Sequence, residues 1–151
     1  AELRLAALLP DEASASGAAR RLRLSNAQHD RLVAAMAAAP VLTSWMSPKA
    51  ARRAVYEGGA VAFADRVKLE WAASGPASAA PQWLALLTIG QTWTAPSLPV
   101  GGADAAAAGV PKGPLVGKVL REVEAWWIDH DFPDDRLAAV ERLKAVAQGL
   151  A

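Results

Sequence analysis

The sequence contains no cysteine, and this absence removes several classes of protein at once. Without cysteine there is no disulfide scaffold, no thiolate-bound zinc or iron–sulfur cluster and no thiol nucleophile. Long apolar runs are also missing. The longest run of bulky apolar residues covers residues 83–90, whereas a membrane-spanning helix needs about 20 residues. The apolar stretch at the N-terminus is too short for a signal peptide. We therefore expect a cytoplasmic protein that does not span a membrane.

Strand-like alternation is almost absent as well, because nearly every segment repeats its apolar residues with a period of about 3.6. Alanine, the strongest helix former, makes up about a quarter of the chain. A length of 151 residues suits one domain of ordinary size. The sequence therefore predicts an all-α fold, an irregular array of about seven or eight helices in a single domain.

Capping residues and prolines predict where the helices begin and end. Ser25 and Gln28 form the pattern of a capping box, and Ser47 before Pro48 is a typical helix start. Pro40 is expected to end the helix between these two signals. Other helices are expected over about residues 1–9, 12–22, 60–73, 80–93, 114–129 and 133–149, with a short alanine-rich helix between 94 and 114.

The apolar pattern also predicts which side chains are buried. The segment 80–93 is apolar nearly all round, which predicts the most buried helix of the fold. Most of the six tryptophans are expected in the core. Trp126 and Trp127 point about 100° apart on a helix, so one can be buried while the other is partly exposed. In the segment 60–73 the residues expected to face the core are Val61, Ala64, Val67 and Trp71.

Several motifs for nucleotide, metal or nucleophilic chemistry do not fit. Residues 113–119 read GPLVGKV, which lacks the glycine spacing and the Ser or Thr of a phosphate loop. His29 and His130 have no second histidine at helical spacing, so we expect exposed helix residues rather than a zinc or di-iron site. Asp134 and Asp135 are expected to cap the last helix. Ser-His-Asp catalysis stays open, although the chain has no GxSxG elbow.

Positive charge is concentrated in one part of a nearly neutral chain. The net charge is +1, from 16 Lys and Arg against 15 Asp and Glu. Residues 18–53 contain seven of these cations and a single carboxylate, Asp30, which leaves a local excess of six. A clustered basic face indicates a partner that carries phosphates, and a solvated helix face is the alternative. The seven cations are Arg20, Arg21, Arg23, Arg31, Lys49, Arg52 and Arg53.

The most specific pattern lies in residues 98–131, LPVGGADAAAAGVPKGPLVGKVLREVEAWWIDHD. It resembles the C-terminal segment of bacterial class II tRNA nucleotidyltransferases, the family of CCA-adding enzymes and poly(A) polymerases. That family joins a Pro-x-x-Gly-x-Asp start, a short helix and a GxxxGPxxG turn. Segments 20–32 and 126–128 also look like members of this family. The matching residues of the motif are Pro99, Gly102, Asp104, Gly109, Val110, Gly113, Pro114, Val116, Gly117 and Leu120.

The resemblance implies that the chain is one part of a larger enzyme. The family's catalytic head carries a Gly-Ser phosphate turn and a D-x-D metal pair, and its neck carries an E-D-x-x-R motif. The sequence contains neither the Gly-Ser turn nor the E-D-x-x-R motif, and its one D-x-D, at residues 129–131, has no Gly-Ser turn before it. The first residue is Ala1, so a fragment or a processed terminus is expected. We expect residues 1–151 to form the C-terminal body and tail, with the head and neck absent.

The resemblance also implies a function. The region would bind tRNA or another RNA 3′ end and position it for the absent catalytic head and neck. The full-length parent would add CCA or A residues using Mg²⁺ and CTP or ATP, whereas this chain would hold no cofactor, no metal and no catalytic residue. CCA addition and poly(A) addition both stay open, as does the oligomeric state. The alternative is a helical protein–protein interaction or dimerisation module without RNA binding.

Phosphate contacts are expected from cations and from the glycine turn. Gly109 is expected to end the short helix with positive φ, and Gly117 to let another backbone approach. Gly113 and Pro114 would open the next helix, whose free N–H groups suit a phosphate. Asp104 would either belong to the binding motif or cap the short helix. The expected RNA-binding residues are Arg20, Arg21, Arg23, Lys49, Arg52, Arg53, Lys112, Gly113, Lys118 and Arg121.

Overall fold

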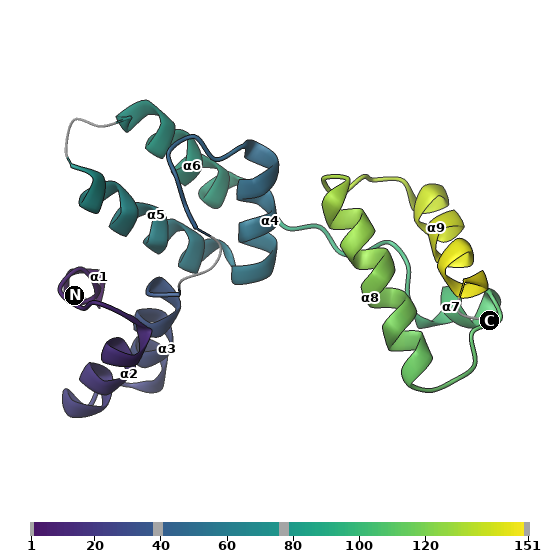
Figure 1. The fold of residues 1–151 in the computed structure, drawn as a ribbon, viewed down its shortest axis with the longest axis horizontal. Helices are drawn as coiled ribbons and strands as arrows, with labels where there is room; N and C mark the ends of the chain where they lie inside the picture. Colours follow the sequence, from purple (N-terminus) through teal and green to yellow (C-terminus); the bar gives the residue numbers. More distant parts are fainter. Residues whose placement is uncertain (1, 38–40, 76–78, 150–151) are drawn as a thin grey trace. The chain divides into compact units, whose positions relative to one another are not determined.

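A computed structural model describes residues 2–37, 41–75 and 79–149. Every regular element in these ranges is an α-helix, which confirms the all-α prediction (Figure 1). The described helices number nine, because the five-residue α1 and the six-residue α7 add to the longer ones. They are α1 Glu2–Ala6, α2 Glu12–Arg21, α3 Asn26–Ala35, α4 Pro48–Gly58, α5 Ala60–Ser74, α6 Ala80–Thr92, α7 Gly102–Ala107, α8 Pro114–Asp129 and α9 Arg136–Gln148.

Side-chain caps begin three helices at the residues that the sequence predicts. Ser25 accepts from the N–H of Gln28 at 3.3 Å, and the Gln28 side chain accepts from the N–H of Ser25 at 3.0 Å. Ser47 and Asp135 accept from the N–H three residues later at 3.2 and 2.9 Å. These caps satisfy donors that a helix start leaves without a partner. The predicted stop at Pro40 lies outside the described residues.

The chain divides into two compact units, residues 1–95 and 96–151, where the sequence predicts a single domain. The apolar side chains gather in separate clusters, two in the first unit and one in the second. Alanine supplies much of the apolar content, and its small side chain buries little surface for a common core. The segment between α6 and α7 carries Pro96 and Pro99, which do not continue a helix.

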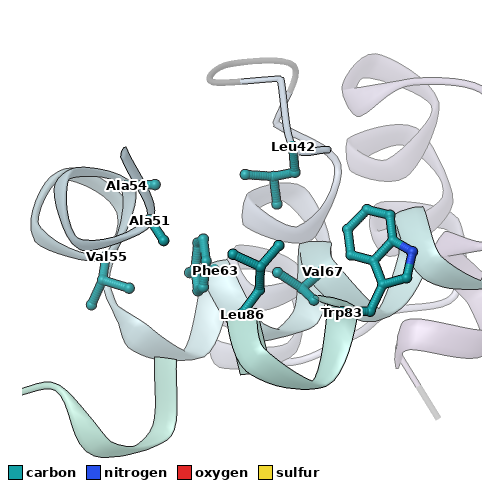
Figure 2. Close-up of a cluster of buried hydrophobic side chains, with 8 residues drawn as sticks. All are labelled: Leu42, Ala51, Ala54, Val55, Phe63, Val67, Trp83 and Leu86. Atoms are coloured by element: carbon teal, nitrogen blue, oxygen red, sulfur yellow. The ribbon is translucent and has the colours of Figure 1, made fainter. Parts of the chain in front are cut away.

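In the first unit, α4, α5 and α6 enclose the larger cluster (Figure 2). Gly90 on α6 allows close packing there, because a Cβ at this position would lie 2.9 Å from Cδ1 of Phe63. A smaller cluster joins α1, α2 and α3. The buried members of the larger cluster are Leu42, Ala51, Ala54, Val55, Phe63, Val67, Trp83 and Leu86.

Two burial predictions for this unit are wrong. Val61 is 63% exposed, and α5 instead turns Phe63 and the buried carboxylate Asp65 inward, together with Val67. Alanines on several sides of α5 leave the phase of its apolar pattern undetermined. The helix α6 packs on α4 and α5 with one side only, so Leu84 on its other side is 53% exposed.

In the second unit, α8 lies along α9, and α7 contacts both (Figure 1). Trp127 is fully buried, and its Nε1 donates to the carbonyl oxygen of Pro133 at 2.9 Å. Trp126 is only half-buried and lies against the ring of His130, which confirms the predicted division between the two tryptophans. The buried cluster consists of Val100, Ala105, Val110, Val119, Val123, Ala139, Leu143 and Val146.

None of the described helices combines the length and the apolar character that crossing a membrane requires.

Candidate nucleic-acid interface

The residues predicted to bind RNA lie in three sets, each near one end of a helix. Nine of the ten are exposed, and Arg52 is half-buried. We name the sets by their helices. The α2 set is Arg20, Arg21 and Arg23, the α4 set is Lys49, Arg52 and Arg53, and the α8 set is Lys112, Gly113, Lys118 and Arg121. The α2 and α4 sets belong to the first unit and the α8 set to the second.

Two glycines with positive φ build the turn that leads into α8. At Gly109, with φ 83°, α7 ends in a Schellman motif in which the N–H of Val110 donates to the carbonyl oxygen of Ala105 at 3.0 Å. Gly113, with φ 133°, precedes Pro114, the first residue of α8. No side chain caps this helix start. Pro114 has no N–H, and the N–H of Val116 donates to the carbonyl oxygen of Gly113 at 3.2 Å. In the first turn, the N–H of Leu115 therefore remains for an outside acceptor such as a phosphate oxygen.

Gly117 serves a different purpose from the one predicted. The sequence predicts a close approach of another backbone, but the one neighbour within 4 Å of a Cβ there, outside the helix's own backbone, is Nη1 of Arg121, at 3.4 Å. Helical side chains tilt toward the N-terminus of their helix. Arg121 therefore lies back along α8 over Gly117, and the glycine leaves room for a guanidinium near the helix start.

Asp104 ties three segments of the second unit together. Its Oδ2 accepts from the N–H of Gly101 at 2.8 Å, and its Oδ1 accepts from Nη2 of Arg136 at 2.6 Å. Arg136 also donates to the carbonyl oxygen of Pro99. The Gly101 hydrogen bond and the Arg136 guanidinium hold the pKa of Asp104 below its ordinary value of 3.8. Asp104 thus has the capping role that the sequence offers as one of its two alternatives.

The α2 set surrounds a strained backbone position. The N–H of Arg23 donates to the carbonyl oxygen of Arg20 at 3.2 Å, in a helix-ending turn where glycine is the usual residue. Arg23 has a left-handed φ of 53° in that turn. This conformation costs a residue with a Cβ about 1 kcal/mol or more. Strain at an exposed arginine is a pointer toward function, although the three charges also complement the negative end of α2.

The α4 set places a cation where its helix does not favour one. Lys49 lies in the first turn of α4, and the N-terminal end of a helix is itself positive. Arg53 is engaged by Glu57 one turn later, with Nε and Oε1 2.8 Å apart. An exposed pair of this kind is weak and open to competition. Lys49 and Arg53 are exposed, so an anionic partner can reach them from solvent.

Ion pairing lowers the positive excess counted along residues 18–53. Arg31 donates to the buried carboxylate of Asp65 at 2.7 and 3.2 Å, and Arg53 pairs with Glu57, so two cations have partners outside that segment. No periodic pattern in the sequence marks Asp65, which lies between Ala64 and Arg66. Moreover, α2 packs on α3, whereas α4 packs on α5 and α6. The α2 and α4 sets thus lie on different groups of helices.

A serine–histidine–aspartate chain occurs where α2 packs on α3. Oγ of Ser16 lies 3.3 Å from Nε2 of His29, and Nδ1 of His29 lies 3.0 Å from Oδ1 of Asp30. Ser16 is inside α2, so the helix uses the N–H groups around it and leaves none for an oxyanion hole. The Ser16–His29 contact therefore joins α2 to α3. His29 is half-buried rather than exposed as predicted, and His130 is exposed.

Within the described ranges no group of three or more His, Asp or Glu side chains is placed to hold a metal ion. The magnesium that the resemblance implies for the full-length parent needs carboxylate and phosphate ligands. The described part of the chain does not offer such a set, and we assign no catalytic step to it.

Comparison with known proteins yields one informative match. No family model matches the chain, and no solved structure matches it. The chain is 41% identical over 87 residues to a protein of Rhodospirillum rubrum described as an uncharacterized 28 kDa protein in the petA 5′ region. The match covers 51% of this chain and 34% of the relative. The chain thus spans about a third of the length of the curated relative it matches, and the description of that relative names no activity.

Proposed function

We propose that the chain is the C-terminal, RNA-binding body and tail of a class II tRNA nucleotidyltransferase that adds CCA or A residues to RNA 3′ ends. In this role it holds tRNA in the cytoplasm for a catalytic head and neck elsewhere in the parent enzyme. Mg²⁺ and the CTP or ATP substrates belong to that head. The described part of this chain binds and positions the RNA and carries out no catalytic step.

The observation that carries the proposal is the uncapped start of α8. The turn before it contains Gly113 with φ 133°, and no side chain occupies the first-turn N–H groups. Lys112 and Lys118 flank this start and are exposed. Arg121 adds a third cation, folded back over Gly117. A backbone N–H donor, a helix dipole and nearby cations are features that hold a phosphate.

The α2 and α4 sets would supply further phosphate contacts from the first unit. Contacts to phosphates fix the position of an RNA without reading its sequence, which suits a domain that must accept every tRNA. Within the first unit the two sets lie on different groups of helices, so each would contact phosphates separately. Lys49 sits at a helix start, whose positive end does not favour a cation, and Arg23 has a left-handed φ of 53° that is strained for a residue with a Cβ.

Charge-removal variants of the α8 set test the proposal. In the triple variant Lys112→Ala, Lys118→Ala, Arg121→Ala we expect tRNA affinity at fixed salt to fall by about tenfold or more, since each phosphate contact contributes to binding. The matched control is Lys144→Ala on α9 of the same unit, an exposed cation paired with Glu141 at 2.9 Å. Equal affinity of the triple variant and the control for tRNA would contradict the proposal.

A protein-interaction or dimerisation module is the second candidate, and the exposed side of α6 favours it. Leu84, on the mostly apolar helix α6, is 53% exposed. This candidate predicts a molar mass that rises with protein concentration, as measured by sedimentation, and a tRNA affinity of zero. A monomer that binds tRNA would remove it.

A further inference from the structure

The first unit contains a buried donor without an acceptor. Trp83 on α6 is 4% exposed, and among the described residues its indole Nε1 is enclosed and has no hydrogen-bond partner. The nitrogen lies on the edge of the ring that points away from Phe63 and Leu86 (Figure 2). A buried N–H without a partner costs about 1–3 kcal/mol. An acceptor other than the described residues would remove this cost.

A cavity lies beside this indole. It has a volume of about 420 Å³ and is lined by Trp83, by residues 42–45 of the loop before α4, and by the end of α5. Several lining side chains are polar, namely Thr43, Ser44, Glu70 and Ser74. The hydroxyls can donate to or accept from a planar polar ring, and the carboxylate can accept from one. Trp83 itself lines the cavity, although its Nε1 is enclosed. The lining therefore combines polar groups with the apolar side chains of Leu42, Ala73 and two tryptophans, which suits a ring with polar edges and an apolar face.

An exposed tryptophan stands at the same cavity. Trp45 lines it and is 81% exposed, which is unusual for the largest apolar side chain. An open indole face is a stacking platform for an unpaired base. The α4 set begins four residues later with Lys49, and four residues reach at most about 14 Å. A phosphate bound by Lys49 and a base at Trp45 are therefore within the span of one nucleotide or two.

We propose that this cavity takes one unpaired nucleobase of the bound RNA. The base stacks on the indole of Trp45, and a ring nitrogen or carbonyl oxygen of the base accepts from Nε1 of Trp83. Because that nitrogen is enclosed in the free chain, the loop at residues 42–45 shifts when the base enters. The proposal rests on the RNA-binding function and adds to it a place where a single-stranded position is held.

Indole N–H signals in the NMR spectrum of the ¹⁵N-labelled full chain report on both tryptophans directly. The probes are a six-nucleotide oligoadenylate and an RNA duplex of the same length. We expect the oligoadenylate to shift the Trp83 signal, identified by its loss in Trp83→Phe, and the duplex to leave it in place. Trp45→Ala should weaken oligoadenylate binding by about fivefold to a hundredfold, the effect of losing one stacked base. The control is Leu137→Ala, an apolar side chain 79% exposed in the second unit, and it should bind as the wild type does.

The outcomes separate this proposal from the proposed function. If tRNA binds but the Trp83 signal stays in place and Trp45→Ala binds normally, the base site is wrong and the RNA-binding function stands. If Trp45→Ala weakens binding while Trp83→Phe does not, the donor is satisfied by ordered water, and the cavity assignment is overturned. If neither tRNA nor oligoadenylate binds, the proposed function fails, and this site fails with it. A protein that binds with Trp45 in its interface in place of RNA would also overturn the assignment.

Discussion

Arg31 on α3 donates to the buried carboxylate of Asp65 on α5, from Nε to Oδ2 at 2.7 Å and from Nη2 to Oδ1 at 3.2 Å. Asp65 is 1% exposed and is the only charged residue buried among the described residues. Lys68 lies 3.6 Å from the same carboxylate. The hydrogen bond raises the pKa of Arg31. This pair links the helices of the smaller cluster to those of the larger one within the first unit.

Removing Arg31 therefore leaves a buried carboxylate with a single, more distant cation. We expect Arg31→Ala to lower the Tm by about 5 °C or more, because a buried charge without its partner is strongly destabilising. Lys144→Ala, which breaks an exposed pair with Glu141, should change the Tm by no more than about 2 °C. Thermal unfolding followed by circular dichroism makes the comparison. Equal changes in Tm in the two variants would mean that the buried pair stabilises the fold no more than the exposed pair does.

The lowered pKa of Asp104 predicts a defined acid dependence of stability. Its folded pKa lies below the ordinary value of 3.8 because of the Gly101 hydrogen bond and the Arg136 guanidinium. The stabilising contribution is therefore complete above about pH 4 and is lost as the pH falls through the folded pKa. In Asp104→Asn, the drop in Tm between about pH 6 and about pH 3 should be smaller than in the wild type. Identical drops would rule out this contribution.

Two glycine substitutions should have opposite effects on stability. Gly109→Ala places a Cβ at φ 83°, and we expect the free energy of unfolding to fall by about 1 kcal/mol. Gly17→Ala lies inside α2 with open space around its Cβ, and stability should rise by about 0.5–1 kcal/mol. Urea unfolding measures both changes. A loss of stability in Gly17→Ala would mean that α2 is not helical at this position.

Arg23 offers a variant in which stability and binding change in opposite directions. Arg23→Gly removes the strain of φ 53° and should raise the free energy of unfolding by up to about 1 kcal/mol. The same change removes a proposed phosphate contact and should weaken tRNA binding. Arg23→Lys keeps the charge and should retain most of the affinity. If Arg23→Gly binds tRNA as tightly as the wild type, Arg23 is a helix-end residue without a role in binding.

Local features of this fold are predictable from the sequence because they depend on neighbouring residues. The Ser25 capping box, the Asp135 cap and the positive φ of Gly109 each require only a few adjacent side chains. The burial of Trp127 beside a half-buried Trp126 follows from helix geometry alone. The three cations of the α8 set, Lys112, Lys118 and Arg121, are exposed at and after the glycine turn.

Features that depend on distant residues are not predictable in this way. Asp65 finds its partner 34 positions away, and no periodic signal marks that contact. The core face of α5 is misassigned at Val61 because alanine dilutes the apolar pattern. The cavity at Trp83 combines the loop at residues 42–45 with two helices, so its lining is visible only in three dimensions.

The salt dependence of tRNA binding tests the central claim most directly. Phosphate contacts release counterions, so the logarithm of the association constant should fall linearly with the logarithm of salt concentration. With the three cation sets engaged, we expect a slope of about −3 or steeper. In the triple variant of Lys112, Lys118 and Arg121 the slope should be shallower, closer to zero by about 2. A slope indistinguishable from zero, or no tRNA binding at low salt, would contradict the account.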